Sequence, residues 1–156
     1  MRVRLLAIVL VLAAVAATLW AAEEPLIGTW KLNLAKSKFT PGPPPRSQTL
    51  QYEPSGANGI QRANDEVNAK GERTQSVVTY VFDGKEHPVT GSPLVDAVVN
   101  RRMDAYTTER VQKKGGKIVN TLRRIVSKDG KTLTITEEGT DDQGKPFSEI
   151  TIYDKQ

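Results

Sequence analysis

From residue 28 onward, short runs of β-branched and aromatic residues alternate with polar residues and are separated by turn signals. Asp83-Gly84 and Asp129-Gly130 are dipeptides that tolerate the positive φ of a tight hairpin turn, and Gly115-Gly116 and Gln143-Gly144 serve in the same way. Successive turn signals lie roughly 8 to 15 residues apart, a spacing typical of an all-β sandwich or barrel. No window in this part of the chain has the periodicity of a helix.

The pattern therefore predicts an all-β domain of about ten strands. They are expected at residues 29–35, 47–53, 59–67, 73–82, 86–90, 94–101, 105–113, 117–127, 132–138 and 147–154. Short connections favour the pairing of neighbours in sequence, so we expect an antiparallel up-and-down meander. Closure into a barrel would bring the first and last strands together and remove the unpaired edges of such a sheet.

Residues 38–47 form the longest irregular stretch and contain Pro41, Pro43, Pro44 and Pro45. Proline has no N–H to donate to a sheet ladder, so we expect a stiff loop between the first two strands. Pro41 and Pro44 also form a P-x-x-P pattern, which leaves open whether the loop is a lid or a docking segment.

The first residues have the pattern of a secretory signal peptide, in which a basic start carrying Arg2 and Arg4 precedes an uncharged apolar run. We expect a signal-peptide helix at residues 1–22 and a β domain at residues 26–156, located in the periplasm or secreted. An uncleaved membrane anchor is the alternative, because about 18 apolar residues are just enough to span a bilayer.

The composition excludes several classes of function. The chain has no cysteine, so its stability must come from packing. Two of its 22 basic residues lie in the leader, which leaves a net charge of about +2 and no case for nucleic acid. His87 is the single histidine, which rules out a zinc site of the usual His/Cys type. With no catalytic motif present, we expect a protein that is not an enzyme and needs no metal or cofactor. No feature specifies an oligomeric state.

Alternation along residues 117–127 places Arg124 on the same face as the apolar Ile118, Leu122 and Val126. If that face points inward, Arg124 needs a carboxylate, water or an anionic ligand, since an unpaired buried charge is costly. The more common arrangement puts the arginine at a barrel mouth with its head in water, and we favour it here and for Arg101 and Arg102. The same parity turns Tyr80, Phe82 and Tyr106 inward.

Two segments resemble the lipocalin and fatty-acid-binding-protein superfamily, the calycins. Gly28-Thr29-Trp30-Lys31-Leu32 is similar to the Gly-x-Trp opening of that superfamily, and Ile152-Tyr153-Asp154-Lys155 is similar to the ending of intracellular fatty-acid-binding proteins. The chain looks most like small, exported, uncharacterised bacterial proteins that are called lipocalin-like. One departure is Thr151, which stands where fatty-acid binders carry an arginine two residues before the terminal tyrosine.

The resemblance implies a barrel whose cavity holds a small hydrophobic or amphipathic ligand, with Arg124, Tyr80, Tyr106 and Tyr153 as the candidate binding residues. It also implies that Gly28 and Trp30 form a structural signature, with Trp30 closing one barrel end beneath a basic side chain, for which Arg124 and Lys155 are the candidates. The competing hypothesis is a secreted or envelope protein that acts through its surface. A roomy, polar interior would favour ligand binding, and a tightly filled interior would favour the alternative.

Overall fold

The computed structural model describes residues 24–141 and 143–156, so the expected leader lies outside the described residues. The described residues form one 3-10 helix, η1 (Leu34–Lys36), and eleven strands. The strands are β1 (Gly28–Leu32), β2 (Lys38–Thr40), β3 (Ser47–Ser55), β4 (Gly59–Val67), β5 (Arg73–Val81), β6 (Glu86–Pro88), β7 (Ala97–Arg102), β8 (Thr107–Lys114), β9 (Lys117–Val126), β10 (Thr132–Thr140) and β11 (Pro146–Lys155). None of the described segments is a helix long and apolar enough to cross a membrane.

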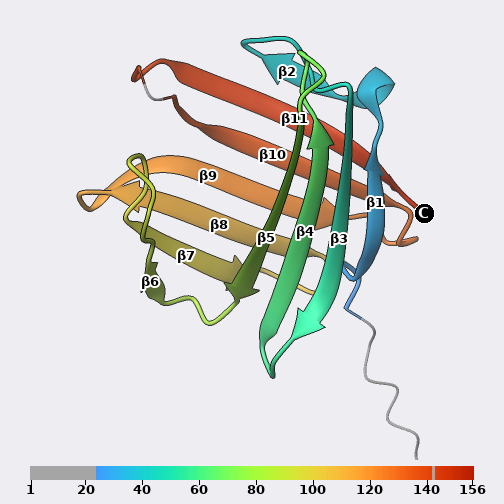
Figure 1. Cartoon of the computed structure of the whole chain (residues 1–156). Helices are drawn as coiled ribbons and strands as arrows, with labels where there is room; N and C mark the ends of the chain where they lie inside the picture. Colours follow the sequence, from blue (N-terminus) through green and yellow to red (C-terminus); the bar gives the residue numbers. More distant parts are fainter. Residues whose placement is uncertain (1–23, 142) are drawn as a thin grey trace, which may run out of the picture.

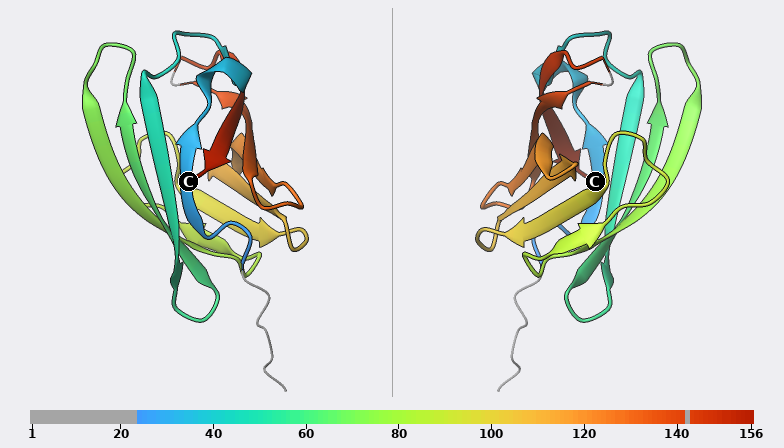
Figure 2. Two further views of the ribbon diagram at one scale, coloured as in Figure 1. Left: turned by 90° about the vertical axis from the view of Figure 1, so that its right-hand side faces the viewer. Right: turned by 90° about the vertical axis from the view of Figure 1, so that its left-hand side faces the viewer.

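All eleven strands belong to one antiparallel sheet with the order β5-β4-β3-β1-β11-β10-β9-β8-β7-β6, and β2 is added beside β11 (Figure 1). The sheet curls so that β3–β5 and β7–β10 face each other across the interior (Figure 2). The first strand pairs with the last through Trp30↔Lys155 and Leu32↔Tyr153. The predicted antiparallel meander, with its first and last strands side by side, is confirmed. The two ends of the order are β5 and β6, which are consecutive in the sequence.

Two expected strands have different bounds, for local reasons. The first strand ends at Leu32 because the Asn33 side chain accepts a hydrogen bond from the Lys36 N–H and caps η1. The strand expected from residue 94 begins at Ala97, because the Ser92 hydroxyl accepts hydrogen bonds from the N–H groups of Leu94 and Val95 in a turn.

The proline-rich segment was expected to be irregular throughout, which is wrong at its start. Lys38–Thr40 forms β2, where Phe39 lies opposite Glu149 of β11. The prolines begin only at Pro41, so the three residues before them still have N–H groups for a ladder.

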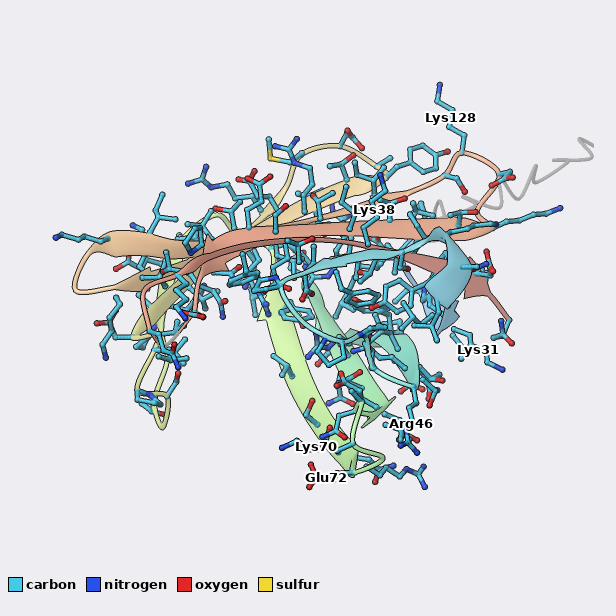
Figure 3. All side chains as sticks on the ribbon, turned by 90° about the horizontal axis from the view of Figure 1, so that it is seen from above. Lys31, Lys38, Arg46, Lys70, Glu72 and Lys128 are labelled. Carbon is cyan, nitrogen blue, oxygen red and sulfur yellow. The ribbon has the colours of Figure 1, made fainter. Side chains whose placement is uncertain are left out.

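The core lies between the two halves of the sheet and follows the alternation of each strand. Leu50 and Tyr52 point inward from β3, while Leu133 and Ile135 point inward from β10. These residues form one cluster with others from both halves, including Leu122, Val126 and Tyr153. Seen from above, side chains occupy the space between the halves, and Lys38 and Lys128 lie on the outer side (Figure 3).

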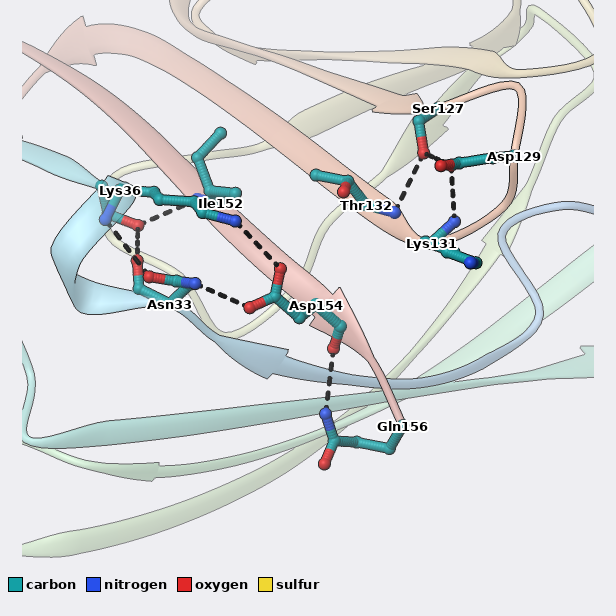
Figure 4. A network of polar contacts seen from close by, with 10 residues as sticks. Asn33, Lys36, Ser127, Asp129, Lys131, Thr132, Ile152, Asp154 and Gln156 are labelled. Carbon is teal, nitrogen blue, oxygen red and sulfur yellow. Dashed lines mark hydrogen bonds and ion pairs between the residues drawn. The ribbon is translucent and has the colours of Figure 1, made fainter.

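A polar network holds η1 against the end of β11 (Figure 4). The Asn33 Nδ2 donates to Asp154 Oδ2 at 2.6 Å, and Lys36 Nζ lies 3.7 Å from Asp154 Oδ1. The Ser37 hydroxyl accepts from the Ile152 N–H and donates to the Asn33 carbonyl. These contacts fix the strand end that carries Lys155.

Trp30 is buried beneath a basic side chain, and this side chain is Lys155. The Trp30 side chain is fully buried, its Nε1 donates to the Leu26 carbonyl at 2.9 Å, and Lys155 Nζ lies 5.2 Å from the ring centroid. Gly28 completes this arrangement, because a Cβ built there would stand 2.8 Å from Lys155 Cε and its φ is +130°. The Gly-x-Trp signature therefore leaves room for the lysine that covers the indole.

Candidate ligand-binding site

Arg124 on β9 points into the interior, and it is far more deeply buried than the barrel-mouth arrangement allows. The side chain is 1% exposed, so the favoured expectation of a solvated guanidinium is wrong. Its Nε donates to the Tyr52 hydroxyl at 3.2 Å, and its Cζ lies 4.7 Å from the Tyr80 ring centroid. Neighbouring Arg123 points outward to Glu109, as the alternation of a strand requires. Arg101 and Arg102 are exposed, as expected.

Two further arginines surround the same tyrosine. Arg62 of β4 has its Cζ 5.8 Å from the Tyr80 centroid, and Arg110 of β8 has its Cζ at 5.7 Å. Sequence reasoning missed both residues. Arg62 shares a face with the apolar Ile60 in an expected strand, and this parity was the available signal.

The three guanidinium groups have unmet hydrogen-bonding capacity. Within the described part of the chain, both terminal nitrogens of Arg124 and the Nε atoms of Arg62 and Arg110 are buried without a partner. Burial lowers the pKa of Arg110, and the neighbouring positive charges of Arg124 and Arg62 lower it further. Burial also disfavours the charge on Arg124, but Tyr52, Tyr80 and Glu137 outweigh it and raise its pKa.

A cavity of about 480 Å³ lies beside this arginine group, and Arg62 lines it. Its apolar wall is formed by Leu50, Leu122 and Ile135. Phe39, Pro43 and Pro45 line it from the proline-rich segment, and Ala69 and Lys70 from the β4–β5 turn. Figure 3 labels Lys70 in that turn and Arg46, whose Nε donates to the Ala69 carbonyl at 3.2 Å.

Three glutamates add a polar wall to the cavity. Glu137 and Glu149 lie directly opposite each other on β10 and β11, and Glu66 comes from β4. Burial, Glu137 and Glu66 together raise the pKa of Glu149. Glu137 also accepts a hydrogen bond of 2.7 Å from Asn120 Nδ2. The cavity is therefore both roomy and polar, which is the condition stated above for ligand binding.

The predicted site residues are only partly brought together. Tyr80 and Arg124 are in contact. Tyr153 lines the cavity, and its hydroxyl donates a hydrogen bond of 2.6 Å to Gln48 Oε1. Burial raises the pKa of the Tyr153 hydroxyl. Thr151, at the position of the missing arginine, is buried beside them. Tyr106, placed inward by parity, is 38% exposed in the bend before β8 and lies outside the group. The assignment of Arg124, Tyr80, Tyr106 and Tyr153 to ligand binding stays a prediction.

Metal-ligating side chains do not cluster within residues 24–141 and 143–156. His87 is half-buried, and its Nε2 lies 3.0 Å from Asp83 Oδ1. Neither residue belongs to the cavity.

The curled sheet matches several solved structures along most of its length. The fluorescent protein UnaG covers 85% of this chain and 98% of its own length, with 17% identity and a TM-score of 0.58. The chain has the calycin fold. A Schistosoma mansoni fatty acid binding protein matches the chain with a TM-score of 0.56 at 13% identity, and zebrafish ileal bile acid-binding protein with 0.52 at 12%. The two cover 85% of this chain and 96% and 99% of their own lengths.

The similarity is found in the structure and not in the sequence. No protein-family model matches the sequence, and no curated protein matches it significantly. At identities of 12–17%, the comparisons establish the fold alone.

Proposed function

We propose that the protein is a non-enzymatic carrier that holds a small amphipathic molecule inside the half-barrel. The apolar part of the ligand packs against Leu50, Leu122 and Ile135, and its anionic group faces Arg124. The observation that carries the proposal is the burial of Arg124 with both terminal nitrogens unpartnered among the described residues. A buried cation of this kind is strongly destabilising unless something compensates its charge.

The cavity supports this proposal over a protein that acts only through its surface. Its volume of about 480 Å³ lies in the range usual for small-molecule sites, and it combines apolar walls with a few polar groups. Among the structural neighbours, one fatty acid binding protein is in complex with arachidonic acid and one bile acid-binding protein with cholic acid. An acidic amphiphile is therefore the ligand class that we propose here.

Native mass spectrometry after gentle purification tests the proposal. The protein is expected to bind one molecule of an added anionic amphiphile, with dodecanoate, dodecyl sulfate and dodecyl phosphate as the probes. Arg124→Met is expected to lose most of this binding, and Arg123→Met, which alters the outward-facing neighbour, is expected to retain it. Bare protein with all three probes would contradict the proposal.

We also propose that the carrier works outside the cytosol, in the periplasm or after secretion. The support is the basic start and apolar run of residues 1–22. Its stability then depends on packing alone, with no disulfide to form.

A further inference from the structure

Unpartnered polar atoms are concentrated on the inner face of β7–β9. Asn100 lies opposite Arg110 in the β7–β8 ladder, and Thr108 lies opposite Arg124 in the β8–β9 ladder. Asn100, Thr108 and Arg124 are each at most 4% exposed. Across the interior, the hydroxyl of Tyr80 on β5 is also buried without a partner. Several buried polar atoms without hydrogen-bond partners in one region indicate a bound ligand, because nearly all buried polar atoms in proteins are hydrogen-bonded.

The chemistry of the occupant follows from the balance of donors and acceptors. The donors among the described residues are four guanidinium nitrogens and the hydroxyls of Tyr80 and Thr108, against two acceptors in the β7–β9 group, Asn100 Oδ1 and Asn120 Oδ1. The guanidinium groups of Arg62, Arg110 and Arg124 bring three positive charges together here. The negative charge of Glu137 favours the charged forms of Arg110 and Arg124. The occupant must therefore be rich in acceptor oxygens and carry more than one negative charge.

A phosphate monoester meets both demands better than a carboxylate does. A carboxylate has two oxygens and a single charge, whereas a phosphate monoester has three terminal oxygens and a charge between −1.5 and −2 near pH 7. Guanidinium groups suit such an oxyanion because they bind it in a bidentate fashion. On β11, by contrast, Thr151 leaves the cavity wall uncharged at the position where the resemblance implied an arginine.

We propose that the ligand of the half-barrel is an amphiphile with a phosphate monoester headgroup, seated between Tyr80 and the inner face of β7–β9. The inference rests on the proposed function and specifies its ligand. Arg62 connects the two parts of the site, because it lies over Tyr80 and also lines the cavity. The apolar chain then runs past Leu122 into the cavity.

Isothermal titration calorimetry at pH 7.5, below the micelle concentration of each ligand, tests the inference with three probes. Dodecyl phosphate is expected to bind with a Kd at least ten-fold lower than that of dodecanoate, and inorganic phosphate is expected to bind more weakly than dodecyl phosphate. Arg110→Met is expected to reduce the preference for phosphate to less than three-fold. Arg123→Met, on the outer face of β9, is expected to leave both Kd values unchanged.

The outcomes separate this inference from the proposed function. Equal affinity for dodecanoate and dodecyl phosphate would overturn the phosphate headgroup and leave an amphiphile carrier in place. No binding of either amphiphile would overturn both, and would mean that water satisfies the buried groups. Inorganic phosphate binding as tightly as dodecyl phosphate would support the phosphoryl site and overturn the amphiphile. If Arg110→Met does not fold, the three probes on the unaltered protein still decide the question.

Discussion

Trp30 and Lys155 come from opposite ends of the described domain, and their contact links those ends through one side-chain pair. Trp30→Ala is expected to lower the free energy of unfolding by about 3–5 kcal/mol, because it empties a fully buried site. A double-mutant cycle of Trp30→Leu with Lys155→Met, measured by urea denaturation, is expected to give a coupling of about 0.5–2 kcal/mol from the cation over the indole. Lys31→Met, on the exposed side of β1, is the control and should show no coupling.

Gly28 is the second residue whose identity the Lys155 contact dictates. Gly28→Ala places a methyl group against Lys155 Cε on a backbone with φ of +130°. Gly42→Ala is the matched control, since its φ of +124° is similar but nothing lies within 4 Å of the new methyl group. The control is expected to lose about 1–2 kcal/mol of unfolding free energy through backbone strain alone. Gly28→Ala should lose more, and an equal loss in the two variants would exclude a steric role for Lys155.

At the scale of elements, β9 carries two adjacent arginines, one pointing inward and one outward, and its alternation predicts that removing them affects stability differently. Arg124→Met is expected to leave the ligand-free protein equally stable or up to about 2 kcal/mol more stable, because it removes a buried charge that no carboxylate pairs among the described residues. Arg123→Met should change stability by no more than about 0.5 kcal/mol. Urea denaturation of the ligand-free proteins measures both effects. A large loss in Arg124→Met would assign Arg124 a structural role.

The facing glutamates of β10 and β11 make stability depend on pH. The pKa of Glu149 is raised in the folded state by burial, Glu137 and Glu66, so folding favours its protonated form. Protonated Glu149 therefore stabilises the folded protein below its ordinary pKa of 4.5, and this stabilisation is lost as the pH rises through the pKa of Glu149 in the folded state. Glu149→Gln should be more stable than the unaltered protein at pH 7, and this difference should vanish near pH 4. Thermal unfolding at both pH values measures it, and Glu138→Gln, on the exposed face of β10, should show no such trend.

For the whole molecule, the leader predicts where the protein resides. The mature protein, shortened by about 22 residues, is expected outside the cytosol, because a basic start before an apolar run directs export. Cell fractionation with mass measurement of the recovered chain provides the test. Recovery of the full-length chain from the cytosol would contradict the proposal, and deletion of residues 1–22 should confine the protein to the cytosol.

The spacing of the turn signals predicted the meander, and the alternation within the strands predicted the inward direction of Arg124 and Tyr80, but not the depth of burial. Arg124 shared a face with Leu122 and Val126, so its inward direction followed from the strand period. Its depth depends on Tyr52 and Tyr80, which come from β3 and β5 across the barrel. No local pattern encodes contacts at such a separation along the chain, and the same is true of Arg62 and Arg110. Tyr106 was misplaced because it lies in the bend before β8, where strand parity does not apply.

The pairing of β1 with β11 also has a consequence for the covalent order of the chain. Because the first strand is hydrogen-bonded to the last, the strands follow one another in a ring that is interrupted only between β5 and β6. A rearranged chain that starts after Gly84, with a short linker from residue 156 to residue 26, would keep all the ladders of the sheet. The fold therefore does not depend on which loop of this ring of strands carries the two chain ends. New ends at the β5–β6 turn would allow a sensor or tether to be attached there, with the contact between Trp30 and Lys155 left intact.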